Sequence, residues 1–262
     1  MALIMLKPDT LDTENRRFEQ APLGAPVFLN SLPKSGSHLL RNIVRMFVPV
    51  SQQYRRQFVQ HRNLTDHLAA FDPRLPLLSW GHLPFSDAAA AATRGARRVL
   101  LVRDPYSWVT ARARFFVSNE VQGKDYELLK SGNISVIELL NLMIFGIQGH
   151  APGLLEMYTH HVVAWLGTNV HLLRFEELKS HVRDIESATA DEYFSALFAA
   201  CAIDRPSNWR ERLTIGANPA QSGTARENLS NEGFDFPDDL PATQRALIDF
   251  AAPGLRAILG YE

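Results

Sequence analysis

Four short apolar segments separated by helical patterns constrain the fold of this 262-residue chain more than any other feature. Each segment is rich in Val and Leu with little alternation of apolar and polar residues, which is typical of parallel strands covered on both faces. They span residues 26–32, 75–80, 98–102 and 170–174. Because strands that alternate with helices favour βαβ units, the sequence predicts a doubly wound parallel α/β sheet with helices on both faces.

The segments between and after these strands carry helical periodicity. Helices are expected over residues 39–47, 88–92, 106–117, 134–147, 153–166, 191–201 and 241–259. Two polar stretches, 118–133 and 204–237, lack such a pattern, and the second is expected to be a lid or a donor-binding loop. The length fits one domain over residues 1–262, with 1–24 as an N-terminal extension.

A polar motif directly follows each predicted strand. The four motifs are Pro33-Lys34-Ser35-Gly36-Ser37, Gly81-His82-Leu83-Pro84, Arg103-Asp104-Pro105 and Phe175-Glu176-Glu177-Leu178. In open α/β sheets, ligands bind beyond the carboxyl ends of the strands. This common placement predicts that the motifs form one ligand-binding site.

The first motif has the chemistry of an anion cradle. Gly36 allows a tight turn, and the helix expected to begin near Ser37 directs N–H groups and its positive dipole end at that turn. Lys34 adds a charge, and Ser35 adds a hydroxyl donor. The order differs from a Walker A loop because lysine precedes glycine. The alternative is an ordinary strand-to-helix turn with an exposed lysine.

Arg103 and His82 are the candidates for binding and proton transfer. An arginine can bind a phosphate through two hydrogen bonds; the alternative for Arg103 is an ion pair with Asp104 or Glu176. A neutral imidazole near pH 7 can accept a proton from a hydroxyl; the alternative for His82 is a structural histidine.

Together these residues resemble the PAPS-dependent sulfotransferase family, whose donor is 3′-phosphoadenosine 5′-phosphosulfate. The resemblance runs from about residue 26 to 180 and rests on four segments in the family's order. They are Pro33-Lys34-Ser35-Gly36-Ser37-His38-Leu39, Gly81-His82-Leu83-Pro84, Arg103-Asp104-Pro105-Tyr106-Ser107 and Leu172-Leu173-Arg174-Phe175-Glu176-Glu177-Leu178-Lys179.

The resemblance implies a soluble single-domain enzyme with a P-loop-like 5′-phosphosulfate loop. In it, Lys34 would stabilise the leaving phosphate, and His82 would deprotonate the acceptor's hydroxyl or amine. The loop from Ser35 through Gly36 and Ser37 to His38 would hold the 5′-phosphosulfate. Further donor contacts would come from Arg103, Ser107 and the position of Ala111 at the 3′-phosphate, Phe175 at the adenine and Arg226 at the 3′-phosphate. The product would be PAP, and no metal is expected.

The sequence departs from the family at several of these positions. Leu39 replaces a tryptophan that stacks on adenine, Trp80 replaces a lysine common two residues before the histidine, and Ala111 replaces a serine. The C-terminal R-K-G-x-x-G-x-W phrase is absent, and Ser222-Gly223-Thr224-Ala225-Arg226 is its nearest counterpart. Thr110 or Arg112 is a candidate to compensate for Ala111.

The net charge and the length of the apolar runs limit the kinds of partner that we expect for this protein. A net charge of −1 argues against nucleic acid, and no apolar run is long enough to span a bilayer, so we expect a cytoplasmic protein. The acceptor is expected to be a small molecule or a carbohydrate, and a homo-oligomer is possible. Two other functions stay open: a P-loop small-molecule kinase that uses ATP–Mg²⁺, and a catalytically inactive nucleotide-binding relative.

Overall fold

The computed structural model describes residues 9–56, 58–118, 121, 124–221 and 233–262. They form two compact units. One consists of residues 9–102 and 160–221 and contains the sheet; the other consists of residues 103–159 and 233–262 and is helical. The expectation of a single domain over residues 1–262 stays a prediction.

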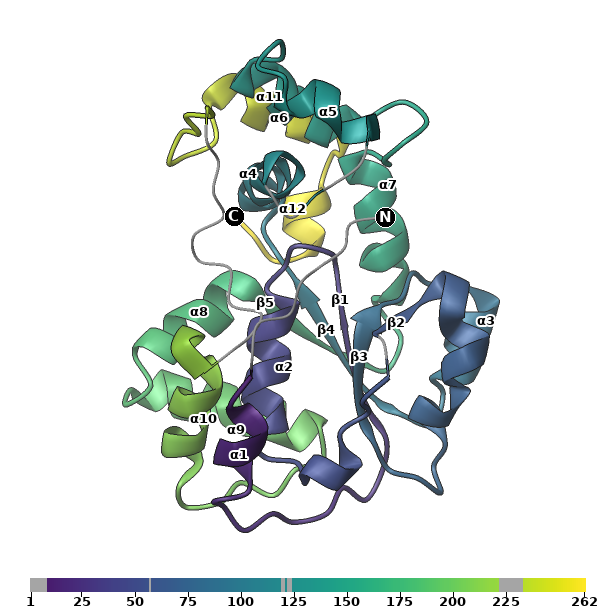
Figure 1. Cartoon of the computed structure of the whole chain (residues 1–262), viewed down its shortest axis with the longest axis vertical. Coiled ribbons are helices and arrows are strands. Elements are labelled where there is room, and N and C mark those ends of the chain that lie inside the picture. Colours follow the sequence, from purple (N-terminus) through teal and green to yellow (C-terminus); the bar gives the residue numbers. More distant parts are fainter. Residues whose placement is uncertain (1–8, 57, 119–120, 122–123, 222–232) are drawn as a thin grey trace. The chain divides into compact units, whose positions relative to one another are not determined.

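The first unit is built on a five-stranded sheet in which every pair of neighbours is parallel. Its order is β2-β3-β1-β4-β5 (Figure 1). The strands are β1 (Val27–Ser31), β2 (Val59–Gln60), β3 (Leu78–His82), β4 (Arg97–Val102) and β5 (Val170–Arg174). The predicted doubly wound α/β class is confirmed. The sequence missed β2 because two residues are too few to show a pattern, and it began β3 three residues too early.

The apolar runs form strands because both faces of the sheet are covered. All five residues of β1 are buried. On one face, Leu29 belongs to a core cluster with Ile43 and Leu213. On the other, the ring of Phe28 packs edge-on against Phe71 at 5.2 Å. Burial on both faces explains why the strands read as continuous apolar segments.

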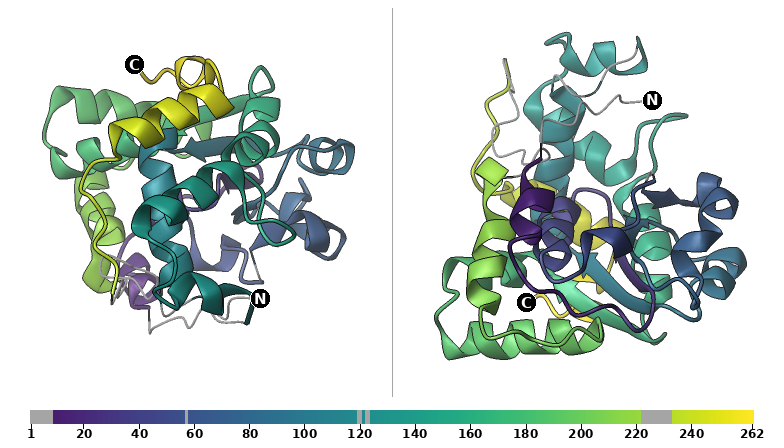
Figure 2. Two further views of the ribbon diagram at one scale, coloured as in Figure 1. Left: turned by 90° about the horizontal axis from the view of Figure 1, so that it is seen from above. Right: turned by 60° about the horizontal axis from the view of Figure 1, so that its bottom comes forward.

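Helices and short 3-10 segments (η) surround the sheet in this unit. They are α1 (Leu11–Asn15), α2 (Ser37–Arg45), η1 (Val50–Gln52), η2 (His61–Phe71), α3 (Asp87–Ala92), η3 (Val163–Trp165), α8 (Phe175–Arg183), α9 (Ala188–Ala200), α10 (Trp209–Ala217) and η4 (Pro219–Gln221). Helix α10 packs on α2, and α1, drawn in dark purple in Figures 1 and 2, lies against α10.

Helix α10 corrects the expectation of a loop over residues 204–237. Trp209 and Leu213 are one turn apart and buried, and Gly216 lies so close to α2 that a Cβ atom would come within 2.7 Å of the Asn42 carbonyl oxygen. Polar residues on the other side of this helix hid its periodicity. A similar correction applies to residues 118–133, where α5 (Lys124–Lys130) lies.

The second unit is a cluster of helices. Its elements are α4 (Pro105–Val117), α5, α6 (Val136–Phe145), α11 (Ala242–Ala251), α12 (Leu255–Ile258) and most of α7 (Leu154–His161). Helix α4 packs against α5, α6 and α11. The buried Arg112 guanidinium donates to the carbonyl oxygens of Met143 at 3.3 Å and Pro152 at 2.7 Å, which joins α4 to the segment after α6.

Candidate active site

The segment from Pro33 to Gly36, which joins β1 to α2, has an unusual backbone. Lys34 has φ 70° and Gly36 has φ 85°, so both lie in the left-handed region. Such a conformation is strained for a lysine, and strained residues of this kind cluster at active sites and ligand-binding segments. The N–H of Ser35 donates to the Leu32 carbonyl at 3.2 Å, which closes the turn. This amide, expected to cradle an anion, is therefore already used within the loop.

The Ser35 side chain is a buried polar group in this loop. The residue is 0% exposed, and its Oγ has no hydrogen-bond partner within the described part of the chain. A buried hydroxyl without a partner is costly, and native proteins usually supply one. The N–H groups at the start of α2 also lack intrahelical acceptors, and they carry the positive end of the helix dipole. The loop therefore fits an anion such as a phosphate or a sulfate.

Phe175 packs directly over the loop. It begins α8 at the end of β5 and is partly buried against the core cluster. A Cβ atom built on Gly36 would lie 2.4 Å from the Phe175 Cδ2 atom. Both the left-handed backbone conformation and the Phe175 ring therefore require a glycine at position 36. The ring thereby forms a wall of the loop, and the contact with adenine that the resemblance implies for Phe175 stays a prediction.

His82 ends β3, and its ring is fixed by the neighbouring strand. Nδ1 lies 2.9 Å from the Ser31 carbonyl oxygen and 3.1 Å from Ser31 Oγ. A carbonyl oxygen can only accept, so Nδ1 carries the proton and donates it. The second ring nitrogen, Nε2, then holds the lone pair. Burial lowers the pKa of His82 to about 4. The hydrogen bond to Ser31 raises this pKa, and the charge of Lys34 lowers it further, but burial is the largest effect. The imidazole is therefore neutral at pH 7.

The segment after His82 is held in place by three hydrogen bonds. The buried Asn30 side chain donates to the Leu83 carbonyl at 2.9 Å and accepts from the Leu83 N–H at 2.9 Å. The Trp165 indole N–H also donates to that carbonyl, at 3.1 Å. Since β1 provides both Ser31 and Asn30, one strand orients the histidine and its connection. No signal in the sequence assigned Asn30 this role.

Aromatic rings border His82. Phe58 lies with its ring centroid 5.4 Å from that of His82 and 5.4 Å from that of Trp80. Trp80 is also 5.0 Å from the His38 ring. Trp80 and His82 are two residues apart on one strand and so point to the same face. That spacing could have indicated Trp80 from the sequence, whereas Phe58 lies outside that strand and carried no such signal.

His161, which ends α7, is a further partly buried histidine in this unit. Its Nδ1 is buried without a hydrogen-bond partner in the described residues. Burial lowers the pKa of His161 to about 4, with smaller contributions from His82 and His160. The carbonyl of His160 accepts a hydrogen bond from the Phe85 N–H at 2.8 Å, which ties the end of α7 to the segment after β3.

The Arg103-Asp104-Pro105 motif begins the helical unit. Arg103 Nε donates to Ser107 Oγ at 2.9 Å, one turn along α4, and the Tyr158 hydroxyl donates to the Arg103 carbonyl at 2.8 Å. Asp104 accepts from the Tyr106 N–H at 3.0 Å and so caps α4. The Asp104 carboxylate is paired with Arg256, with both nitrogen–oxygen distances 3.1 Å.

Other predicted donor residues differ in what the structure shows. Ala111 is partly buried on α4 and offers no polar side-chain atom. Arg112, one of the two candidates to compensate for it, directs its guanidinium at the backbone carbonyls of Met143 and Pro152. Arg226 lies outside the described residues. The loop residues Lys34, Ser35, Gly36, Ser37 and His38 are brought together with His82 and Phe175 in the sheet unit, whereas Arg103, Ser107 and Ala111 belong to the helical unit.

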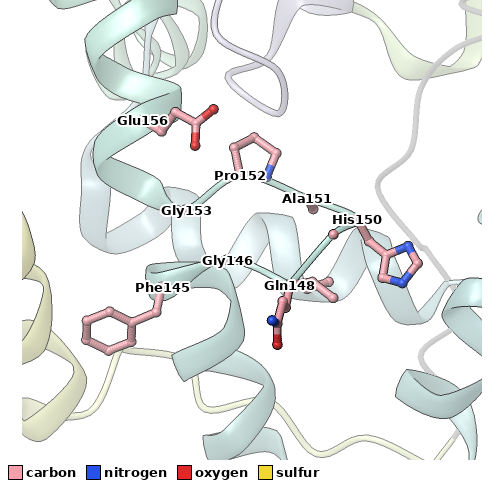
Figure 3. Close-up of a pocket in the computed structure, with 10 residues that line it drawn as sticks. Phe145, Gly146, Gln148, His150, Ala151, Pro152, Gly153 and Glu156 are labelled. Carbon is pink, nitrogen blue, oxygen red and sulfur yellow. The ribbon is translucent and has the colours of Figure 1, made fainter.

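The helical unit also contains a hollow that the sequence did not indicate. It has a volume of about 560 Å³ and lies at the loop between α6 and α7 (Figure 3). Its polar side chains include Gln148, His150 and Glu156, and glycines form much of its wall. None of the predicted site residues lines it.

Within residues 9–56, 58–118, 121, 124–221 and 233–262, no group of three or more His, Cys, Asp or Glu side chains is placed to hold a metal ion. In the same part of the chain, no helix has the length and apolar character needed to cross a bilayer.

Comparison with known proteins gives a likeness among solved structures. No family model matches the sequence, and no curated protein matches it. The crystal structure of mouse sulfotransferase SULT7A1 complexed with PAP is similar, with a TM-score of 0.55 at 14% sequence identity. The match covers 92% of this chain and 85% of that one. The chain therefore has the α/β fold of a sulfotransferase.

Proposed function

We propose that the protein is a PAPS-dependent sulfotransferase that moves a sulfuryl group to a hydroxyl or amine of a small-molecule or carbohydrate acceptor. The observation that carries the proposal is the state of His82. Its Nδ1–H is held by Ser31, and its imidazole is neutral, so Nε2 can take a proton from an acceptor. This histidine ends the strand next to β1, and β1 leads into the anion-binding loop.

The loop residues fit the sulfated end of the donor. The unpartnered Ser35 hydroxyl and the amides at the start of α2 match phosphate or sulfate oxygens. Lys34 would neutralise charge on the leaving phosphate. Ser37 and His38 are the first two residues of α2 and would border the same phosphate. The donor itself supplies the sulfuryl group and a good leaving group, so these residues need only position and stabilise charge.

The remaining donor contacts extend the proposal. Arg103, oriented by its hydrogen bond to Ser107, would bind the 3′-phosphate, and Phe175 would border the adenine. Ala111 would contribute only a methyl group where relatives of this kind have a serine. Arg226, in the proposed donor-binding loop within 204–237, would add a second cation. A cytoplasmic location stays a prediction.

Ligand-dependent stability tests the proposal. A ligand that binds only the folded state raises the melting temperature by mass action. We expect PAP to stabilise the wild type more than ADP or ATP–Mg²⁺ does, and Arg103→Ala to abolish that preference. Arg94→Ala, at an exposed position on the protein surface, is the matched control and should keep it.

Three outcomes would contradict parts of the proposal. A larger shift with ATP–Mg²⁺ than with PAP would favour the kinase. A PAP preference without sulfation of any acceptor from PAPS would favour a catalytically inactive relative. If Arg103→Ala leaves the PAP preference intact, the 3′-phosphate is bound elsewhere.

A further inference from the structure

Arg41 is a cation that the proposed reaction has not used. It lies on α2, one turn after Ser37, and its Cζ atom is 5.1 Å from the centroid of the Trp80 ring. Among the described residues its side chain makes no hydrogen bond and no ion pair. Burial lowers the pKa of Arg41 to about 10, and the charge of Arg45 adds to that effect. The guanidinium is thus partly buried and stacked on an indole.

The acidic groups nearest to Arg41 are already paired. Arg45 Nη1 lies 2.6 Å from Asp9, and Arg45 Nη2 is paired with Asp12. Arg55 is bound to the other oxygen of Asp12 at 2.7 Å. Within the described part of the chain, Arg45 and Arg55 therefore hold these two carboxylates, and Arg41 forms an ion pair with neither of them. A partly buried cation without an ion-pair partner favours an anionic ligand.

An aromatic surface joins Arg41 to His82. The guanidinium lies on Trp80, and Phe58 contacts the rings of both Trp80 and His82. All of these side chains are partly exposed. Trp80 and His82 are two residues apart on β3, which corresponds to about 7 Å along a strand. A flat molecule with a hydroxyl at His82 would therefore lie along Phe58 and Trp80 and end near Arg41.

We propose that the acceptor is a hydroxylated aromatic acid whose hydroxyl faces His82 and whose carboxylate binds Arg41 at the other end of this aromatic surface. The inference rests on the proposed function for the identity of the acceptor. A planar guanidinium matches a carboxylate through two parallel hydrogen bonds, and Trp80 fixes the plane of the guanidinium. Arg41 is then the residue that selects acidic over neutral acceptors.

A pair of probes that differ only in charge tests this binding directly. 4-Hydroxyphenylacetate and 4-hydroxyphenylacetamide are titrated without donor while tryptophan fluorescence is recorded. A change of the signal on titration is assigned to Trp80, because Trp108, Trp165 and Trp209 are each no more than 2% exposed and cannot contact the added ligand. We expect the acid to bind at least about tenfold more tightly than the amide, since a charge-assisted pair is lost with the amide.

Variants assign the effect to Arg41. Arg41→Gln should bring the affinity for the acid down to that for the amide, and Arg41→Lys, which keeps the charge but not the planar fork, should restore part of it. Arg94→Gln is the matched control at an exposed site. Melting temperatures establish that each variant is folded. Equal binding of acid and amide by the wild type, or unchanged acid binding by Arg41→Gln, overturns the proposal.

Added PAP separates the acceptor site from the donor site. We expect the acid to bind equally well with and without PAP. Displacement of the acid by PAP, together with weaker PAP binding by Arg41→Gln, would assign Arg41 to a donor phosphate and overturn the proposal. The titration needs no turnover, so it can succeed even if the protein does not prefer PAP. In that case acid binding that depends on Arg41 would contradict the proposed function but not the acceptor inference. Normal PAP binding with equal acid and amide affinity removes the acceptor inference alone.

Discussion

Gly36 offers the sharpest test of how the loop between β1 and α2 is built, because a single added methyl group meets two separate energetic costs there. Gly36→Ala places a Cβ at a residue with φ 85°, which costs about 1–2 kcal/mol for an L-residue. The same Cβ lies 2.4 Å from Phe175 Cδ2 and 2.5 Å from Phe175 Cε2, so the ring must move, and such overpacking costs about 1–3 kcal/mol. The sum of about 2–5 kcal/mol is a large part of an ordinary folding stability of about 5–15 kcal/mol.

A double-mutant cycle separates the two costs. The free energy of unfolding is measured in urea for the wild type, Gly36→Ala, Phe175→Ala and the double variant. With Phe175 shortened, Gly36→Ala should cost only the backbone term of about 1–2 kcal/mol, which leaves a coupling of about 1–3 kcal/mol. Gly167→Ala provides the control, since Gly167 has φ 74° and no atom lies within 4 Å of the point where its new methyl group would sit. It should show the backbone cost alone.

The result that would refute this reasoning is equal destabilisation by Gly36→Ala in both backgrounds. Phe175 would then not restrict the loop, and its place as a wall of the site would be wrong. A cost at Gly36 no larger than at Gly167 in the wild-type background would lead to the same conclusion.

Two further predictions concern buried charge. Burial lowers the pKa of His82 and of His161 from 6.5 to about 4. Between these pH values the unfolded state therefore binds more protons than the folded state. The contribution of the two histidines to stability is full above pH 6.5 and falls as the pH drops towards 4. Urea unfolding should show a loss of about 2 kcal/mol per histidine between about pH 7 and pH 5. His82→Gln should flatten that profile, whereas the exposed His61→Gln should not, and identical profiles would contradict the assignment. Separately, Arg45→Met should destabilise the fold by about 3–5 kcal/mol, since it leaves Asp9 and Asp12 without their buried cation. Arg17, whose side chain is 60% exposed, pairs with Glu14, and Arg17→Met should change the free energy of unfolding by less than about 1 kcal/mol. Similar losses at both sites would refute the role of Arg45.

The pairing of Arg45 explains one carboxylate pKa in this network. Burial alone would raise the pKa of Asp12, but the hydrogen bond and charge of Arg45, with those of Arg55, outweigh it and bring that pKa below its usual value.

The sequence by itself determined the class of fold and the chemistry of the loop. Short apolar strands and amphipathic helices are local patterns, so the parallel sheet and the positions of Lys34, Gly36 and His82 at strand ends could be predicted from neighbouring residues alone. The sequence also located Arg103 at the start of a helix with Ser107 one turn on. Helix α10 was missed because its apolar residues are few and its burial depends on α2.

Only the tertiary structure decided how those residues are set for function. The proton on Nδ1 of His82 depends on the Ser31 carbonyl, 51 positions away in the chain, and no local pattern reports such a pair. Phe175 over Gly36, Phe58 beside Trp80 and His82, and Arg41 on Trp80 likewise join separate elements. Backbone periodicity is set by residues a few positions apart, whereas a site is set by side chains that meet only when the sheet places its strands side by side.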